Sequence, residues 1–385
     1  MGASGNLGTS VLRSLSMEPR VESVLGVARR LPNLNVEKVA WASADVVTDD
    51  LAPLLRGADA VVCLAWIIQP SRDLTKQWMT NVEGTMRVAY ATKEAGVPAF
   101  LYASSIGAYS PGPKDRAVDE SWPTGGILTS YYGRHKAEVE RRLDRFEAEA
   151  PDVRVVRMRP GLVFKREAAQ GIRRLFAGPF FPGLLANPSL INLVPDIENL
   201  RSQVIHSYDV GEAFRLAILD ENARGAFNLA TEPVLDAKEI GRILGARPVP
   251  FSAQLARAGA GLSWALRLQP VPPGWLDLSL NVPIMDTTRA RTELGWAPSC
   301  SADEALLELL EGLRTGAGLD TPPLSPKTGG PFRVREILTG VGGGSREGRS
   351  LARQGRRQGG QRPRPGHPGV HRRHRARHLD SHLRL

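Results

Sequence analysis

Short apolar runs that are rich in β-branched residues alternate with helical patterns along most of this chain, and this alternation constrains its fold most. The apolar runs lie at residues 24–27, 60–64, 99–103 and 153–156. Helical periodicity separates them, at Val11 and Leu15, at Val82, Met86 and Ala89, and over the charged stretch 130–149. Strands that alternate with helices of this length predict a doubly wound parallel sheet of the α/β class.

The chain has 385 residues, and we expect three parts in it. Residues 1–160 carry the regular alternation and predict the doubly wound domain. Residues 161–317 are richer in prolines and aromatic residues, which predicts a smaller substrate lobe interleaved with strands of the sheet. Residues 318–385 become Pro-, Gly- and Arg-rich with few large apolar side chains, so we expect a disordered tail.

The formal net charge of +10 belongs to the tail. Twelve of the fifty basic residues but only two of the forty acidic residues follow residue 345, so the preceding chain is neutral. Arginines without interleaved aromatic residues would give only sequence-independent phosphate contacts. The charge therefore disfavours a nucleic-acid partner for the folded part.

Hydropathy and cysteine content exclude several other classes. No apolar stretch approaches 18 residues, which argues against a membrane span, and the N-terminus lacks a secretory pattern. The two cysteines, Cys63 and Cys300, cannot form a disulfide framework or a zinc cluster. We expect a cytoplasmic protein with no metal site.

A glycine-rich turn opens the chain. Gly2, Gly5 and Gly8 form the spacing G-A-S-G-N-L-G, with Asn6 and Leu7 between them, and a helical pattern follows. Glycines let the backbone approach a pyrophosphate that faces the helix N-terminus. The alternative is a chance spacing in a glycine-rich chain. Since Met1 directly precedes the turn, we expect the sheet to lack the strand that would normally lead into it.

Three further segments follow predicted strands and are candidates for cofactor contacts. Arg29 follows the strand at 24–27, where an acid would bind a ribose hydroxyl and an arginine accommodates a 2′-phosphate. This favours NADP, with NAD still open; the alternative is a solvated basic turn. The remaining candidates at strand ends are Asp45, Val46, Leu64, Ala65 and Trp66.

Tyr132 and Lys136 are the sharpest candidate pair. Their i,i+4 spacing in a helical segment places both side chains on one face. An ammonium beside a phenol lowers the pKa of the phenol toward a value useful in acid–base catalysis. Ser105 lies at the end of the predicted strand 99–103, the position where doubly wound folds place reactive groups. A surface contact is the alternative for the pair.

The order glycine turn, strand-end serine and Tyr-x-x-x-Lys resembles the NAD-dependent epimerase/dehydratase family, the extended branch of the short-chain dehydrogenases/reductases. Further matching segments are Asn81–Thr85, Ser104–Tyr109, Arg159–Gly161, His206–Val210, Asp286–Thr288 and Leu294–Trp296. The resemblance implies a Rossmann-like fold with its first strand missing. It also implies catalytic roles for Ser105, Tyr132 and Lys136, and cofactor contacts that include Asn81 and Pro160.

The sequence also departs from the family pattern. Leu162 stands where sugar-nucleotide epimerases usually carry an asparagine, Lys165 replaces a common glycine, and Ser202 replaces an arginine. These departures disfavour a nucleotide-sugar substrate. We interpret His135 as a surface residue and His206 as a residue that packs the lobe onto the sheet.

The leading functional hypothesis is an NAD(P)-dependent enzyme that moves a hydride between a small carbonyl or hydroxyl substrate and the nicotinamide. Tyr132 would exchange a proton with the substrate oxygen, Ser105 would hydrogen-bond it, and Lys136 would hold the ribose. Net reduction and net epimerisation share these steps. The alternative is a non-catalytic NADP-binding regulatory protein, and a homodimer stays open.

Overall fold

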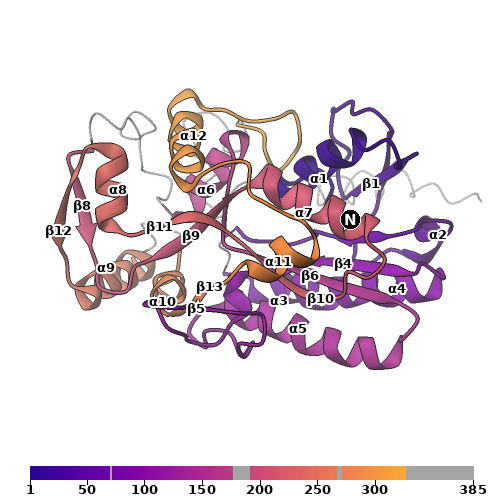
Figure 1. Ribbon diagram of the computed structural model, residues 1–385, viewed down its shortest axis with the longest axis horizontal. Helices are drawn as coiled ribbons and strands as arrows, with labels where there is room; N and C mark the ends of the chain where they lie inside the picture. Colours follow the sequence, from indigo (N-terminus) through magenta and orange to yellow (C-terminus); the bar gives the residue numbers. More distant parts are fainter. Residues whose placement is uncertain (70–71, 177–190, 267–270, 327–385) are drawn as a thin grey trace, which may run out of the picture. The chain divides into compact units, whose positions relative to one another are not determined.

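Four parallel strands in the spatial order β10–β6–β4–β3 form the central sheet of the computed structural model (Figure 1). Their bounds are β3 (Val61–Cys63), β4 (Ala99–Ala103), β6 (Arg154–Pro160) and β10 (Gly225–Leu229). Each neighbouring pair is parallel, and Leu101 of β4 lies opposite Val156 of β6. The predicted parallel α/β sheet is confirmed.

The structure describes residues 1–69, 72–176, 191–266 and 271–326. All of them belong to one compact unit that extends from Met1 to Gly343. Most of the predicted tail, from residue 327 onward, lies outside the described residues. The predicted division at residue 160 stays a prediction.

Helices cover both faces of the central sheet because its strands alternate their side chains between two apolar layers. Phe100 and Tyr102 of β4 pack toward α4 (Gly84–Glu94) and α5 (Tyr131–Glu149). Leu101 and Ala103, between them, pack with residues of α1 (Asn6–Ser16) and α7 (Ser207–Leu219). In Figure 1, α4 and α5 accordingly lie on one side of the sheet and α1 and α7 on the other.

The strands β1 (Val24–Ala28) and β2 (Val39–Ser43) form a sheet separate from the central one, and the N-terminal residues lie between the two sheets. In the described part of the chain, β1 and β2 pair only with each other. Met1 lies between them and β3, since its amino group donates to the Val62 carbonyl at 2.7 Å and its carbonyl accepts from Leu64 N at 2.9 Å. Gly2 N donates to the Val27 carbonyl at 2.8 Å. Met1 therefore bonds to β3, whereas Gly2 and Ala3 bond to β1.

Three smaller sheets complete the described strands. These strands are β5 (Ala117–Val118), β7 (Leu162–Phe164), β8 (Leu193–Asp196), β9 (Ser202–His206), β11 (Thr231–Leu235), β12 (Arg247–Pro250) and β13 (Ile284–Met285). They pair as β11–β9–β7, β12–β8 and β13–β5. Since β10 returns to the central sheet, the chain beyond residue 161 contributes strands to both the central and the smaller sheets.

Short helices connect these strands. They are α2 (Ala52–Leu55), α3 (Leu74–Trp78), η1 (Met79–Glu83), η2 (Ile106–Ala108), η3 (Arg166–Ala168), α6 (Ala169–Phe176), α8 (Ala237–Leu244), α9 (Ala253–Ala265), α10 (Gly274–Asn281), α11 (Thr288–Glu293) and α12 (Ala302–Thr315). Among the helices that the structure describes, none is both long enough and apolar enough to cross a membrane.

Helix α5 carries the predicted Tyr-x-x-x-Lys pair, and its own sequence explains where it begins and how it packs. The Ser130 hydroxyl caps it by accepting a hydrogen bond from Gly133 N at 3.3 Å. Val139, Leu143 and Phe146, at helical spacing, are completely buried against the sheet. This packing fixes the rotation of α5 about its axis, so its first turns are held beside the carboxyl end of β4.

Candidate active site

The predicted site residues meet at the carboxyl edge of the central sheet. Residues 64–66 follow β3, Ser104 and Ser105 follow β4, and Pro160 ends β6. Because these strands are parallel neighbours, their carboxyl ends lie at one edge. The structure therefore brings together the three strand-end segments that the sequence singles out.

Ser105 and Tyr132 lie close together at this edge. Ser105 is the N-cap of η2, and its Oγ accepts a hydrogen bond from Gly107 N at 3.0 Å. The Tyr132 ring and the Ser105 Oγ both lie beside Gly107, since a methyl group built there would meet Cε1 of the ring at 2.8 Å and the Ser105 Oγ at 3.5 Å. The absence of a side chain at Gly107 makes this proximity possible. The phenol and the hydroxyl can therefore address one substrate oxygen.

Lys136 lies one helical turn beyond Tyr132 and is buried. Its ammonium donates to the Ala103 carbonyl at 2.6 Å and to the Tyr102 hydroxyl at 3.2 Å, and the Trp66 ring centroid is 3.5 Å away. Burial lowers the pKa of Lys136 to about 7. Burial also raises the pKa of Tyr132 to about 12. The expected lowering of the phenol pKa by the ammonium is therefore wrong for this state, because the ammonium is directed to β4.

Aromatic rings enclose the Tyr132 phenol. The Trp66 ring lies edge-on at 5.9 Å between centroids, and the Trp275 ring of α10 lies at 5.0 Å with a 33° tilt. Tyr132 is 9% exposed as a result. Trp66 covers the Lys136 ammonium as well, so this residue borders both the predicted cofactor side and the predicted catalytic pair.

Asn81 holds the segment that carries Trp66. Its Oδ1 accepts from Ile67 N at 2.7 Å, and its Nδ2 donates to the Ile67 carbonyl at 3.1 Å. Asn81 lies in η1, a π-helical turn between α3 and α4, and is completely buried. Both polar atoms of the Asn81 side chain bond to the backbone of Ile67. Asn81 therefore positions the predicted cofactor segment and is not a free donor.

The glycine turn has the shape that a dinucleotide pyrophosphate requires. Gly2 has φ +79° and packs so tightly on the strand-end segment that a methyl group would lie 2.7 Å from Ala65 N. Gly5 is the N-cap of α1 and provides no side-chain acceptor to the first turn. A methyl group on Gly5 would meet only the Gly2 carbonyl at 3.5 Å, so it would point into open space in front of the turn. Free N–H groups beside open space fit an anion.

Residues between the glycines have packing roles that accompany this geometry. Leu7 packs against the apolar layer that contains Val11 and Phe214. The Asn6 carbonyl accepts hydrogen bonds from the Ser10 hydroxyl at 3.3 Å and the Ser207 hydroxyl at 3.3 Å. These contacts fix α1 against α7 and so fix the direction in which its N-terminus points.

The segments after β1 and β2 lie beside each other. Arg29 is exposed at the end of β1, and its carbonyl accepts from the Ser43 hydroxyl at 3.1 Å. Asp45 follows β2 and accepts a hydrogen bond from Val47 N at 3.0 Å. Val46 is buried and lies against Gly84, where a methyl group would come within 2.6 Å of its Cγ2 atom. Arg29 is thus free to meet a 2′-phosphate, whereas Val46 acts through packing.

The two histidines His135 and His206 lie outside the trio. His135 was predicted at the surface, which is wrong: it is 5% exposed, and the Trp78 and Tyr131 rings lie edge-on to it with centroids 5.3 and 5.9 Å away. Burial lowers its pKa to about 4. His206 caps α7 and approaches Glu308 of α12 at 3.2 Å, in agreement with the predicted packing role.

A family model for the NAD dependent epimerase/dehydratase family matches residues 1–230. The chain belongs to this family. An uncharacterised protein of Mycobacterium tuberculosis is 26% identical over 344 residues, which cover 87% of this chain and 32% of that protein. The chain thus spans about a third of the length of that relative.

Two further similar proteins carry functional names. The sterol-4-alpha-carboxylate 3-dehydrogenase (decarboxylating) of Saccharomyces cerevisiae is 25% identical over 190 residues, 46% of this chain and 54% of that protein. The crystal structure of a dTDP-glucose 4,6-dehydratase from Streptomyces venezuelae, with NAD and TYD bound, superposes with a TM-score of 0.60 at 17% identity. That alignment covers 82% of this chain and 95% of the dehydratase, and it establishes the shared Rossmann-type fold.

Glu140 is a buried charge at this site that the sequence reasoning missed. It follows Lys136 by one further helical turn, and no part of it is exposed. Its carboxylate accepts hydrogen bonds from Ser104 at 2.5 Å and from Arg159 at 2.9 Å. The signal for it was present, since Arg157 and Arg159 occupy one face of the buried strand β6 and require an acidic partner.

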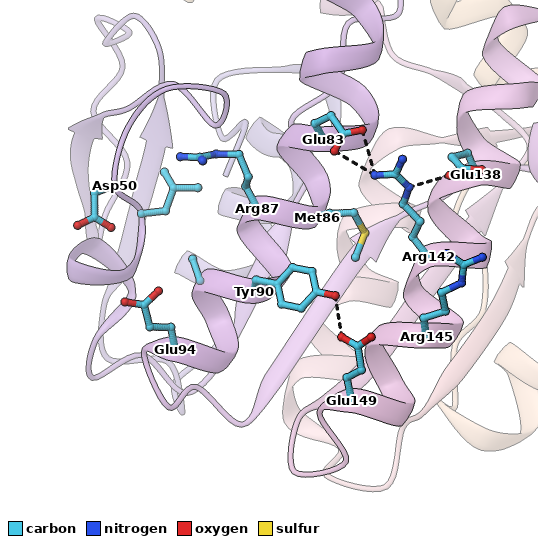
Figure 2. A pocket seen from close by; sticks show the side chains of 12 residues that line it. Asp50, Glu83, Met86, Arg87, Tyr90, Glu94, Glu138, Arg142, Arg145 and Glu149 are labelled. Atoms are coloured by element: carbon cyan, nitrogen blue, oxygen red, sulfur yellow. Dashed lines mark hydrogen bonds and ion pairs between the residues drawn. The ribbon is translucent and has the colours of Figure 1, made fainter.

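A groove of about 620 Å³ lies elsewhere, between α4 and α5 (Figure 2). Several of its polar side chains pair with one another: Arg142 bonds to Glu83 and Glu138, and Tyr90 donates to Glu149 at 2.8 Å. The predicted catalytic and cofactor residues do not line this groove, which therefore belongs to the outer surface of the two helices rather than to the candidate site.

Proposed function

We propose that this chain is an NADP(H)-dependent oxidoreductase or epimerase that acts on a carbonyl or hydroxyl substrate through Ser105, Tyr132 and Lys136. The proximity of the Ser105 hydroxyl and the Tyr132 ring beside Gly107 carries the proposal. It places two proton-bearing groups at the carboxyl edge of the sheet, where doubly wound folds bind their ligands. The open glycine turn at the start of α1 supports a dinucleotide at the same edge.

Each residue of the trio has a role that follows from its surroundings. Tyr132 exchanges a proton with the substrate oxygen, and Ser105 donates a hydrogen bond to that oxygen as its charge changes. Lys136 supplies a positive charge one helical turn from the phenol. In the structure its ammonium bonds to Ala103 and Tyr102, and a ribose hydroxyl beside it would offer a further acceptor.

The residues fit a bound nicotinamide dinucleotide, whose chemistry is to give or take a hydride. The free N–H groups at the start of α1 would hold its pyrophosphate, and Gly2 and Gly5 leave the necessary room. The exposed Arg29, where an acid would favour NAD, supports NADP. The crystal structure of the Streptomyces venezuelae dehydratase contains NAD, so both dinucleotides are included in the test.

The residues on the substrate side of the site support a secondary alcohol or a ketone as the substrate. They do not require that the substrate carry a nucleotide. Lys165, which departs from the family pattern, is buried and donates to Thr9 Oγ1 at 2.8 Å, so its charge is used inside the protein. Arg201, next to the substituted Ser202, donates to the Lys114 carbonyl at 2.6 Å. These two cations are thereby engaged away from a substrate phosphate.

The decisive experiment is a screen of secondary alcohols, ketones, sterols and nucleotide sugars, with NADP(H) or NAD(H) absorbance as the readout. Tyr132→Phe should lower kcat by about 10²- to 10⁴-fold, since it removes the proton donor. Tyr90→Phe is the matched control, because Tyr90 is exposed on α4 and away from the trio. Tight cofactor binding without any turnover would instead favour the regulatory protein.

A further inference from the structure

The Glu140 carboxylate is the most completely bonded charged group beside the candidate site. Its Oε1 atom accepts from Ser104 Oγ at 2.5 Å and from Arg159 Nε at 2.9 Å. Its Oε2 atom accepts from Arg159 Nη2 at 2.9 Å and from Arg157 Nη1 at 3.1 Å. Burial alone would raise the pKa of Glu140, but the arginines and Ser104 outweigh it and lower the pKa to about 2. The group is therefore a fixed negative charge.

This cluster joins the three elements that carry the candidate site. Glu140 belongs to α5, Ser104 directly precedes Ser105 at the end of β4, and Arg159 lies near the end of β6. Arg159 Nη1 also donates to the Tyr109 hydroxyl at 3.0 Å. Tyr109 is the C-cap of the short helix η2, and Ser105 is its N-cap. The cluster thus holds the short helix η2 at both ends, next to Ser105 through Ser104 and at Tyr109 through Arg159.

The same charge lies one helical turn from Lys136 and stabilises its ammonium. The groups that face this ammonium are the Cys63 thiol of β3, the Tyr102 hydroxyl and Ala103 carbonyl of β4, the Trp66 ring, and Tyr132 and Glu140 of α5. Of the groups just named, Glu140 alone carries a full negative charge at neutral pH. Without it, the buried Lys136 would lose its proton more readily.

A buried ionic cluster is a costly way to obtain stability alone, because apolar side chains of similar volume often serve as well. We propose that Glu140 is a positioning residue for the Ser105–Tyr132–Lys136 site. It fixes Ser105 relative to α5 through Ser104, and its negative charge stabilises the Lys136 ammonium. This inference rests on the proposed function, and its test is designed to separate the two.

Two variants probe the two roles. Ser104→Ala removes the link to Ser105 and leaves the Glu140 charge, so kcat should fall about tenfold with little change in cofactor KM. Ser104→Thr, which keeps the hydroxyl, should restore most of the loss. Glu140→Gln removes the charge, and the Lys136 titration midpoint should fall by about one unit or more relative to the unmodified protein. The ¹⁵N NMR signal of the lysine Nζ reports this midpoint, with Lys136→Met for its assignment.

Matched controls separate these roles from general destabilisation. Thr92→Ala removes another buried hydroxyl, which donates to the Val88 carbonyl at 2.8 Å within α4. Glu138→Gln neutralises a neighbouring carboxylate of α5 that pairs with Arg142. Both controls should lower the melting temperature without changing kcat or the Lys136 midpoint.

Three outcomes bear on the inference. If Ser104→Ala and Glu140→Gln match their controls in kcat and in the Lys136 midpoint, Glu140 is only a structural residue and the proposal is overturned. If Glu140→Gln does not fold, the kcat of Ser104→Ala and its rescue by Ser104→Thr decide. If the unmodified protein turns over none of the substrates, the proposed function fails, and the NMR midpoint alone decides whether Glu140 stabilises the Lys136 ammonium.

Discussion

A single methyl group at Gly107 should disable the candidate site while leaving the fold intact. A methyl carbon built on Gly107 would lie 2.8 Å from Cε1 and 3.0 Å from Cδ1 of Tyr132. Carbon atoms in contact normally stand about 3.5–4.0 Å apart, so the ring must retreat by roughly 1 Å. A displacement of about 1 Å can reduce catalysis by about 100-fold. We therefore expect Gly107→Ala to lower kcat/KM by about two orders of magnitude.

The stability cost of this substitution should be moderate, because overpacking a core typically costs about 1–3 kcal/mol. Gly259→Ala is the matched control, since a methyl group there meets no atom within 4 Å in the middle of α9. That control should gain about 0.5–1 kcal/mol from helix propensity and keep its activity. Urea unfolding and steady-state kinetics measure both effects. A folded Gly107→Ala protein that retains kcat/KM within twofold would refute the assigned contact between Gly107 and the catalytic ring.

Two further predictions concern cofactor choice and acid stability. Arg29→Ala should raise the Kd for NADP about tenfold or more and leave that for NAD nearly unchanged, because only the 2′-phosphate loses a charged partner; equal losses in a calorimetric titration would contradict the NADP assignment. Burial lowers the pKa of His135 from 6.5 to about 4. As the pH falls, this histidine is therefore protonated in the unfolded protein before it is protonated in the folded protein. Its contribution to stability is therefore present above about pH 6.5 and is lost as the pH falls toward 4, by on the order of 3 kcal/mol, and His135→Phe should flatten this part of the urea-unfolding profile.

Local spacing was enough to predict the elements that carry the candidate site. The i,i+4 spacing of Tyr132 and Lys136 requires a common helix face, and the alternation of strands requires that Ser105 end a parallel strand. The turn at Gly2 and Gly5 was predictable for the same reason, because a backbone that closely approaches a neighbouring group favours glycine at that position. Each of these inferences depends on neighbours in sequence.

Contacts between distant elements were not predictable in this way. His135 was placed at the surface because its own sequence neighbours are charged, whereas Trp78, more than fifty positions earlier, covers it. The direction of the Lys136 ammonium depends on a carbonyl and a hydroxyl of β4, so its spacing from Tyr132 could not reveal the pKa of either group. Glu140 was missed because its partners lie on two other strands.

The separation of the β1–β2 sheet from the central sheet has a consequence for how a bound dinucleotide would act on this protein. Arg29 directly follows β1 of the two-stranded sheet, whereas Tyr132 and Lys136 lie beside the four-stranded sheet. A ligand that reaches from Arg29 to Lys136 would therefore act as a cross-link between the two sheets. If the two halves of the dinucleotide are added as separate mononucleotides, each would bind to one sheet only. They would therefore lose the advantage of intramolecular binding. The intact dinucleotide should consequently raise the melting temperature by more than the two halves do together.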